Sequence, residues 1–180
     1  MANEERELSI TELLQASIDH FEANELPILN AFEQLLIEQA RLLRDGTISE
    51  REFFETLTTG EPLTLILVRS RNEDGYEEQI EVERTTESKI RVRTHEAGSF
   101  PDVTTTIGLS ESGELQVEDI HAEYLDPEGL VEPHVVEGDR IYSDIISPNS
   151  EGKMEQQSTP KQEAGEWHIE LLKDVVAWEN

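Results

Sequence analysis

The chain has 180 residues, with 41 acidic and 14 basic side chains, a formal net charge of −27 and no cysteine. This charge repels phosphate backbones and anionic membranes, so it argues against direct nucleic-acid binding and favours basic protein partners. Without cysteine there is no disulfide, thiolate nucleophile or cysteine metal site. The first residues, MANEERELS, do not resemble a secretory signal, and the longest apolar run, 63–68, is too short to cross a bilayer. We therefore expect a cytoplasmic protein with no membrane insertion.

Residues 1–60 are predicted to form a helical region, a hairpin of two to three helices. Ser9 and Glu12 have the spacing of a capping box, and apolar residues follow at helical intervals. Pro27 is expected to end or reset this helix and to begin a second one, which Gly46 would terminate. A short third helix follows. We expect that these N-terminal helices allow copies of the chain to associate as a homo-oligomer.

Residues 45–52 carry the glycine and the final glutamate of the second half of an EF-hand calcium loop. The first two ligand positions would fall on Arg41 and Leu43, which cannot bind calcium. We therefore interpret the segment as a capped helix–turn–helix. The stretch RLLRDGTISEREFFETL, 41–57, is also similar to the short helical hairpins called SHOCT domains. That resemblance implies a helix–turn–helix and a role in oligomerisation.

From Leu63 the apolar pattern changes to a period of two, which predicts an antiparallel β domain over residues 61–147 with five or six strands. The fold class expected is therefore α+β, with the helices first. Residues 63–70 are apolar on both faces and are predicted to be a central strand. A change of phase in residues 115–124 predicts a β-bulge near Glu118 and Asp119. The other predicted strands are 77–84, 88–95, 103–109 and 135–146.

Four of the basic residues fall within residues 80–93: Arg84, Lys89, Arg91 and Arg93. A hairpin with its loop at 85–87 would set Val82 opposite Ile90 on a buried face and Glu81 opposite Arg91 on a solvent face. We interpret the basic residues as a solvent-side ladder of ion pairs. An anion-binding site is the alternative.

Residues 148–165 contain one large apolar side chain, Met154, and are predicted to be a flexible linker. Residues 166–180 form an amphipathic segment whose apolar positions fit a strand and a helix equally well. Its Trp167, Leu171 and Trp178 are candidates for binding the domain or a partner.

His121 and Glu123 are two residues apart on a predicted strand, so they would share one face. Such a pair can begin a metal site, although further ligands are not specified. The sequence has no P-loop and no dinucleotide-binding glycine motif, so no cofactor is expected.

These features together predict a non-catalytic acidic protein-interaction module: an adaptor, assembly factor or chaperone-like accessory protein that binds the basic surface of another protein. The candidate interaction residues are Glu118, Asp119 and Glu123 in the acidic stretch 95–147, and Trp167, Leu171 and Trp178. One alternative is an acidic inhibitor or nucleic-acid mimic that occupies a basic groove. A weaker alternative is a metal-dependent enzyme around His121 and Glu123.

Overall fold

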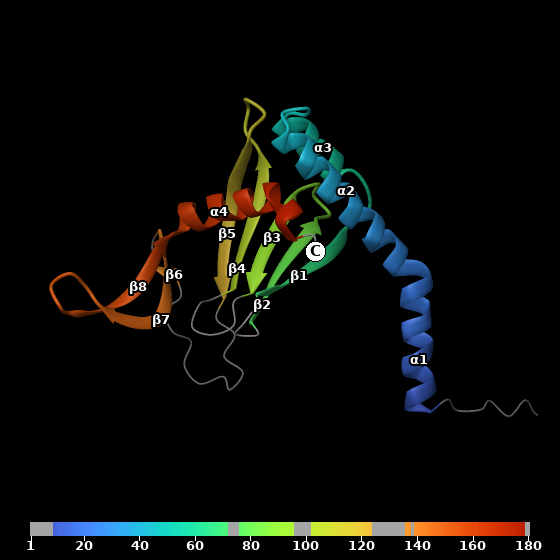
Figure 1. The fold of residues 1–180 in the computed structure, drawn as a ribbon, viewed down its shortest axis with the longest axis horizontal. Coiled ribbons are helices and arrows are strands. Elements are labelled where there is room, and N and C mark those ends of the chain that lie inside the picture. Colours follow the sequence, from blue (N-terminus) through green and yellow to red (C-terminus); the bar gives the residue numbers. More distant parts are fainter. Residues whose placement is uncertain (1–8, 72–75, 96–101, 124–135, 138, 179–180) are drawn as a thin grey trace, which may run out of the picture.

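The structure, a computed structural model, describes residues 9–71, 76–95, 102–123, 136–137 and 139–178. A long N-terminal helix precedes a five-stranded antiparallel sheet, and a small second sheet and a C-terminal helix follow (Figure 1). This arrangement confirms the predicted α+β class. Residues 72–75 and 126–129, whose sequences NEDG and DPEG are typical of turns, lie outside the described residues.

The N-terminal region is one long bent helix followed by a short one. Capping boxes start both: the Ser9 and Ser49 hydroxyls accept from the amides of Glu12 and Glu52, whose carboxylates accept in return. Because Glu52 serves this cap, residues 45–52 form the expected helix–turn–helix. The helical elements are α1 (Ile10–His20), the π-helical turn η1 (Phe21–Glu25), α2 (Leu26–Arg44), α3 (Glu50–Thr58), α4 (Lys161–Lys173) and the 3-10 turn η2 (Val175–Trp178).

Pro27 resets the long helix without ending it, which is one of the two outcomes that the sequence predicted. It occupies the first turn of α2, where its missing N–H is tolerated. The preceding Leu26 amide bonds to the Phe21 carbonyl, five residues back, which is the π-helical pattern. The long helix bends at this junction (Figure 1).

The main sheet is an antiparallel meander in which every strand pairs with its neighbour in sequence. The first strand therefore lies at an edge, and the prediction of a central strand at 63–70 is wrong. Its outer apolar side chains, Ile66 and Val68, are about half exposed, at 50% and 48%. The strands are β1 (Leu63–Arg71), β2 (Tyr76–Arg84), β3 (Ile90–His95), β4 (Asp102–Leu109) and β5 (Leu115–Glu123).

The predicted bulge is confirmed in β5. Thr106 pairs with Asp119 while Ile107 pairs with Val117, so Glu118 is the extra residue. The bulge moves the apolar side chains of the second half of β5 back onto the helix-covered face.

The predicted flexible linker at 148–165 is wrong for most of its length. Met154–Pro160 forms a strand, and α4 begins at Lys161. The small sheet, separate from the main one, consists of β6 (Val136–Glu137), β7 (Arg140–Pro148) and β8 (Met154–Pro160). Backbone pairing and the bond from Arg140 Nε to Ser158 Oγ, 2.8 Å, hold β8 although its Met154 is exposed. The single strand predicted at 135–146 is divided between β6 and β7.

The β2–β3 hairpin forms as predicted, but its register differs by two residues. Val82 faces Val92 and Glu81 faces Arg93. A shift of two keeps every side chain on its face and keeps acidic residues opposite basic ones. The face pattern alone therefore could not distinguish the predicted register from the observed one.

The loop of this hairpin decides its register. The Thr85 amide donates to the Lys89 carbonyl, the Thr85 hydroxyl accepts from the Lys89 amide, and both distances are 3.0 Å. Ser88 takes a left-handed conformation with φ of 58°. The turn is therefore one residue later than the predicted loop at 85–87.

The core lies between one face of the main sheet and the helices α2, α3 and α4, with α4 crossing the strands (Figure 1). Gly165 permits this close crossing, because a Cβ there would lie 2.7 Å from a Val117 methyl group. The segment 166–180, whose structure the sequence left open, is thus largely helical. Its buried residues are His168, Ile169, Leu172 and Val175.

Candidate interaction surfaces

The open face of the main sheet, away from the helices, carries two cross-strand rows of polar side chains. These rows line a shallow hollow of about 460 Å³. One row is Thr64, Glu83, Arg91, Thr106 and Asp119, and the other is Glu81, Arg93, Thr104 and His121. The alternation of strand residues places them here, since every second residue of each strand points away from the core.

The basic residues of β3 and its loop bind carboxylates of the same sheet. Arg91 Nη1 lies 3.0 Å from a Glu83 carboxylate oxygen, and Arg93 Nη2 lies 3.1 Å from one of Asp102. Lys89 Nζ lies 2.8 Å from a carboxylate oxygen of the bulge residue Glu118. This geometry favours the ladder interpretation over the anion site, because each cation already has an internal counter-charge.

Arg84 departs from the predicted solvent-side ladder, because it is buried on the helix-covered face. Its Nε donates to the Leu57 carbonyl at 2.7 Å, and its Nη1 donates to the Glu61 carbonyl at 3.2 Å. The guanidinium also lies over the Phe32 ring, 4.9 Å from its centroid. Arg84 therefore caps the C-terminus of α3, where cations are favoured, and joins the sheet to two helices. Burial lowers the pKa of its side chain.

The acidic candidates of β5 do not converge on one site. Glu118 pairs with Lys89, whereas Asp119 and His121 share the open face and line its hollow. The side chain of Glu123 lies outside the described residues. Among the residues that the structure describes, no three His, Asp or Glu side chains come together as a metal site.

Trp167 and Leu171 of α4 come together with Leu43 of α2 in a groove of about 570 Å³. We call it the α4 groove. Trp167 is 47% exposed there, which is a large aromatic surface for a packed domain. The third candidate, Trp178, ends η2, and its side chain lies outside the described residues.

Ion pairs surround the α4 groove. Arg44 pairs with Asp174, and Lys173 Nζ lies 2.5 Å from Glu50 and 3.7 Å from Glu170. The rim therefore carries both signs, and the apolar floor is its distinctive feature. Sequence patterns pointed to Trp167 and Leu171 but not to the residues of α2 and α3 that complete the groove.

A buried histidine was missed at the sequence level. His168 is fully buried on the core face of α4. Its Nδ1 lies 2.6 Å from the Thr105 hydroxyl, and its Nε2 lies 2.9 Å from the Thr94 hydroxyl. Burial lowers the pKa of His168 to about 4. Helical spacing is the signal that could have found it, because His168 and Leu172 are four residues apart on the core face of α4.

The projecting helix α1 presents a third surface. It has no buried residue, although its sequence is amphipathic, and its large apolar side chains face solvent. The sequence indicated the helix and its apolar side, but not that this side would be left uncovered.

No family model, curated protein or solved structure matches this chain. Within the described ranges, no helix has the length and apolar character needed to span a membrane. The functional argument therefore rests on these surfaces and on the distribution of charge.

Proposed function

We propose that this chain is a non-catalytic protein-interaction module, an adaptor or accessory protein, that binds the basic surface of another protein. The observation that carries the proposal is the internal use of its basic side chains. Within the described residues, at least seven of the 14 contact oxygen atoms of the same chain: Arg44, Arg84, Lys89, Arg91, Arg93, Arg140 and Lys173. Because the ion pairs among these contacts neutralise carboxylates as well as cations, an approaching molecule meets the net charge of −27, carried by the acidic residues that remain.

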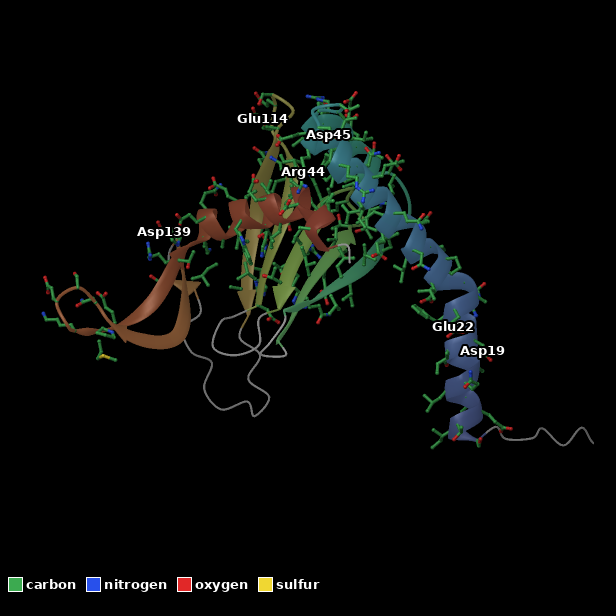
Figure 2. All side chains as sticks on the ribbon, in the orientation of Figure 1. Asp19, Glu22, Arg44, Asp45, Glu114 and Asp139 are labelled. Atoms are coloured by element: carbon green, nitrogen blue, oxygen red, sulfur yellow. The ribbon has the colours of Figure 1, made fainter. Side chains whose placement is uncertain are left out.

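The acidic residues reach every extremity of the molecule. No Lys or Arg occurs between residues 10 and 40, which span α1, η1 and most of α2. Figure 2 shows Asp19 and Glu22 on the projecting helix, Glu114 at the β4–β5 turn and Asp139 beside the small sheet. A basic partner would be attracted from any of these directions, which raises its association rate more than its final affinity.

The α4 groove supplies the apolar contact that charge alone does not. Exposed tryptophans are frequent energetic centres of protein interfaces, and Trp167 lies beside Leu171 in a concave site. The proposal therefore combines charge attraction with anchoring at Trp167. It includes a cytoplasmic location, since a cysteine-free chain needs no oxidising compartment, and association of copies through the N-terminal helices.

The test begins with capture on immobilised protein from native extract, followed by binding measurements with each purified candidate. Affinity should fall at least tenfold between about 50 mM and about 500 mM salt. Trp167→Ala should weaken binding at both concentrations and leave the salt dependence unchanged. Met154→Ala is the matched control, because Met154 is also an exposed apolar side chain but lies on the small sheet.

A partner whose affinity stays flat with salt and is indifferent to Trp167→Ala would refute the proposal. Competition by DNA for the purified partner would show that the target surface is a nucleic-acid groove. That result would favour the mimic alternative over the adaptor.

A further inference from the structure

The apolar side of the projecting helix forms a continuous stripe that nothing in the described chain covers. Its side chains are between 36% and 77% exposed. The stripe consists of Ile10, Leu13, Leu14, Ile18, Phe21 and Leu26. α1 continues through η1 into α2, so it is not an isolated helix, but its large apolar side chains remain in water and would gain from burial.

The π turn keeps the stripe on one side of the helix. Phe21 and Leu26 are five residues apart, and an α-helix would separate them by about 140° around its axis. The bond from the Leu26 amide to the Phe21 carbonyl widens this turn by one residue and so brings the two side chains closer to the same side of the helix. The irregularity therefore helps to preserve the stripe.

The carboxylates of α1 lie away from the stripe. Glu12 and Asp19 are both more than about 130° around the helix from Leu14. Local hydrogen bonds hold them there: Glu12 accepts from the Ser9 amide, and Asp19 accepts from the Gln15 side chain, both at 2.9 Å. Two copies of the stripe can therefore meet without opposing these carboxylates, despite the net charge of −27 on each chain.

We propose that the stripe is the seam of a homodimer in which two copies of α1 pack antiparallel about a two-fold axis at Ile18. Ile10 and Leu26 are each eight residues from Ile18, so each would lie opposite the other in the second copy. Leu14 is four residues from Ile18 and Phe21 is three, so these two side chains would lie within one residue of the same level in the pair. The antiparallel direction follows from charge, because it places the two acidic bodies at opposite ends of the pair, where repulsion is weakest.

The exposed area suits a weak but specific dimer. Together the exposed fractions of the six side chains amount to about three fully exposed large side chains. If each of these has the area that one large aliphatic side chain buries, the stripe offers roughly 350 Å² of apolar surface. Because interfaces are little more than half apolar, this implies an interface of about 1,200 Å² over both copies. That is the lower end of specific interfaces, so the dimer should have a dissociation constant in the micromolar range.

The dimer rests on the proposed interaction role but responds to salt in the opposite sense. Glu22 of the π turn lies four residues from Ile18, beside the seam, Glu25 lies near its end, and the whole chain is acidic. Salt should therefore strengthen the dimer, whereas it should weaken binding to a basic partner. This difference keeps the failure of one proposal distinct from failure of the other.

Sedimentation equilibrium of the full chain at about 50 µM tests the dimer directly. We expect dimer at high salt and its loss in the variant Leu14→Gln with Ile18→Gln. Urea unfolding of that variant should remain close to wild type, since neither residue is buried. A wild-type chain that is monomeric at both salt concentrations overturns the proposal. So does a dimer that survives the double substitution.

Engineered cysteines test the geometry, because the natural chain has none. Ile18→Cys at the axis should form a disulfide-linked dimer on mild oxidation, and Asp19→Cys, away from the stripe, should not. Ile10→Cys alone should not cross-link, since the two copies of residue 10 would be about 24 Å apart. Mixed with Leu26→Cys, it should give a linked heterodimer. Efficient linkage of Ile10→Cys to itself would show a parallel pair and overturn the antiparallel arrangement.

Discussion

His168 should make the stability of this protein depend on pH between about pH 4 and pH 6.5. Its neutral ring is satisfied by one hydroxyl on each side, from Thr94 and Thr105. A protonated ring needs both hydroxyls as acceptors and would carry a charge where the side chain is fully buried. Burial therefore lowers the pKa of His168 from its ordinary 6.5 to about 4.

The sign follows from proton binding. Between the two pKa values the unfolded chain binds the proton and the folded chain does not, so acid favours the unfolded chain. The contribution of His168 is present above pH 6.5 and is lost as the pH falls toward 4. The complete loss amounts to about 3 kcal/mol, of which about 2 kcal/mol falls between pH 8 and pH 5.

The assay is urea unfolding of wild type and His168→Gln at several pH values across that range. Protonation of carboxylates affects both proteins alike, so the difference between their unfolding free energies isolates the histidine. We expect wild type to lose about 2 kcal/mol relative to the variant between pH 8 and pH 5. His121→Gln, which removes an exposed histidine from the open face, is the control. Parallel pH profiles for wild type and His168→Gln would refute the reasoning.

Three further substitutions test the packing. Arg84→Met keeps the apolar stem but removes the donors to the α3 terminus, and should lower the unfolding free energy by about 2 kcal/mol. Gly165→Ala should destabilise by about 1 kcal/mol because its Cβ meets a Val117 methyl at 2.7 Å, and Val117→Ala should relieve that loss. Exchanging the charges of Glu83 and Arg91 should be milder than reversing either one, with a coupling of about 0.5 kcal/mol by double-mutant cycle. An unchanged stability for Arg84→Met, or no coupling between residues 83 and 91, would contradict the contacts on which these predictions depend.

Features set by local chemistry could be predicted from the sequence. The capping box of α1 depends on residues three apart and occurs where expected, and the box of α3, Ser49 with Glu52, has the same spacing. The bulge at Glu118 was predictable because only an extra residue can return the apolar side chains of β5 to one face. The register of the β2–β3 hairpin could not be predicted, because pairing Val82 with Ile90 or with Val92 satisfies the same face pattern.

Features set by distant partners could not be predicted. Strand β8 has the composition of a linker. Backbone pairing with β7 holds it in place, so its exposed side chains need not be apolar. The α4 groove joins Leu43 to Trp167, which are far apart in sequence. Arg84 was different: it alternates in step with Ile80 and Val82, so the strand period itself placed it on the buried face.

The position of the basic cluster in the fold explains why it lies in this part of an acidic chain. Strand β3 is the middle strand of the main sheet, so cations on it and its loop reach carboxylates on both sides. Arg91 reaches β2, Arg93 reaches β4, and Lys89 reaches the bulge of β5. Placed on an edge strand, the same residues would reach one neighbour only, and the other carboxylates of the open face would repel one another. Because the sheet neutralises itself in this way, the charge left for attracting a partner lies mainly on the helices and turns.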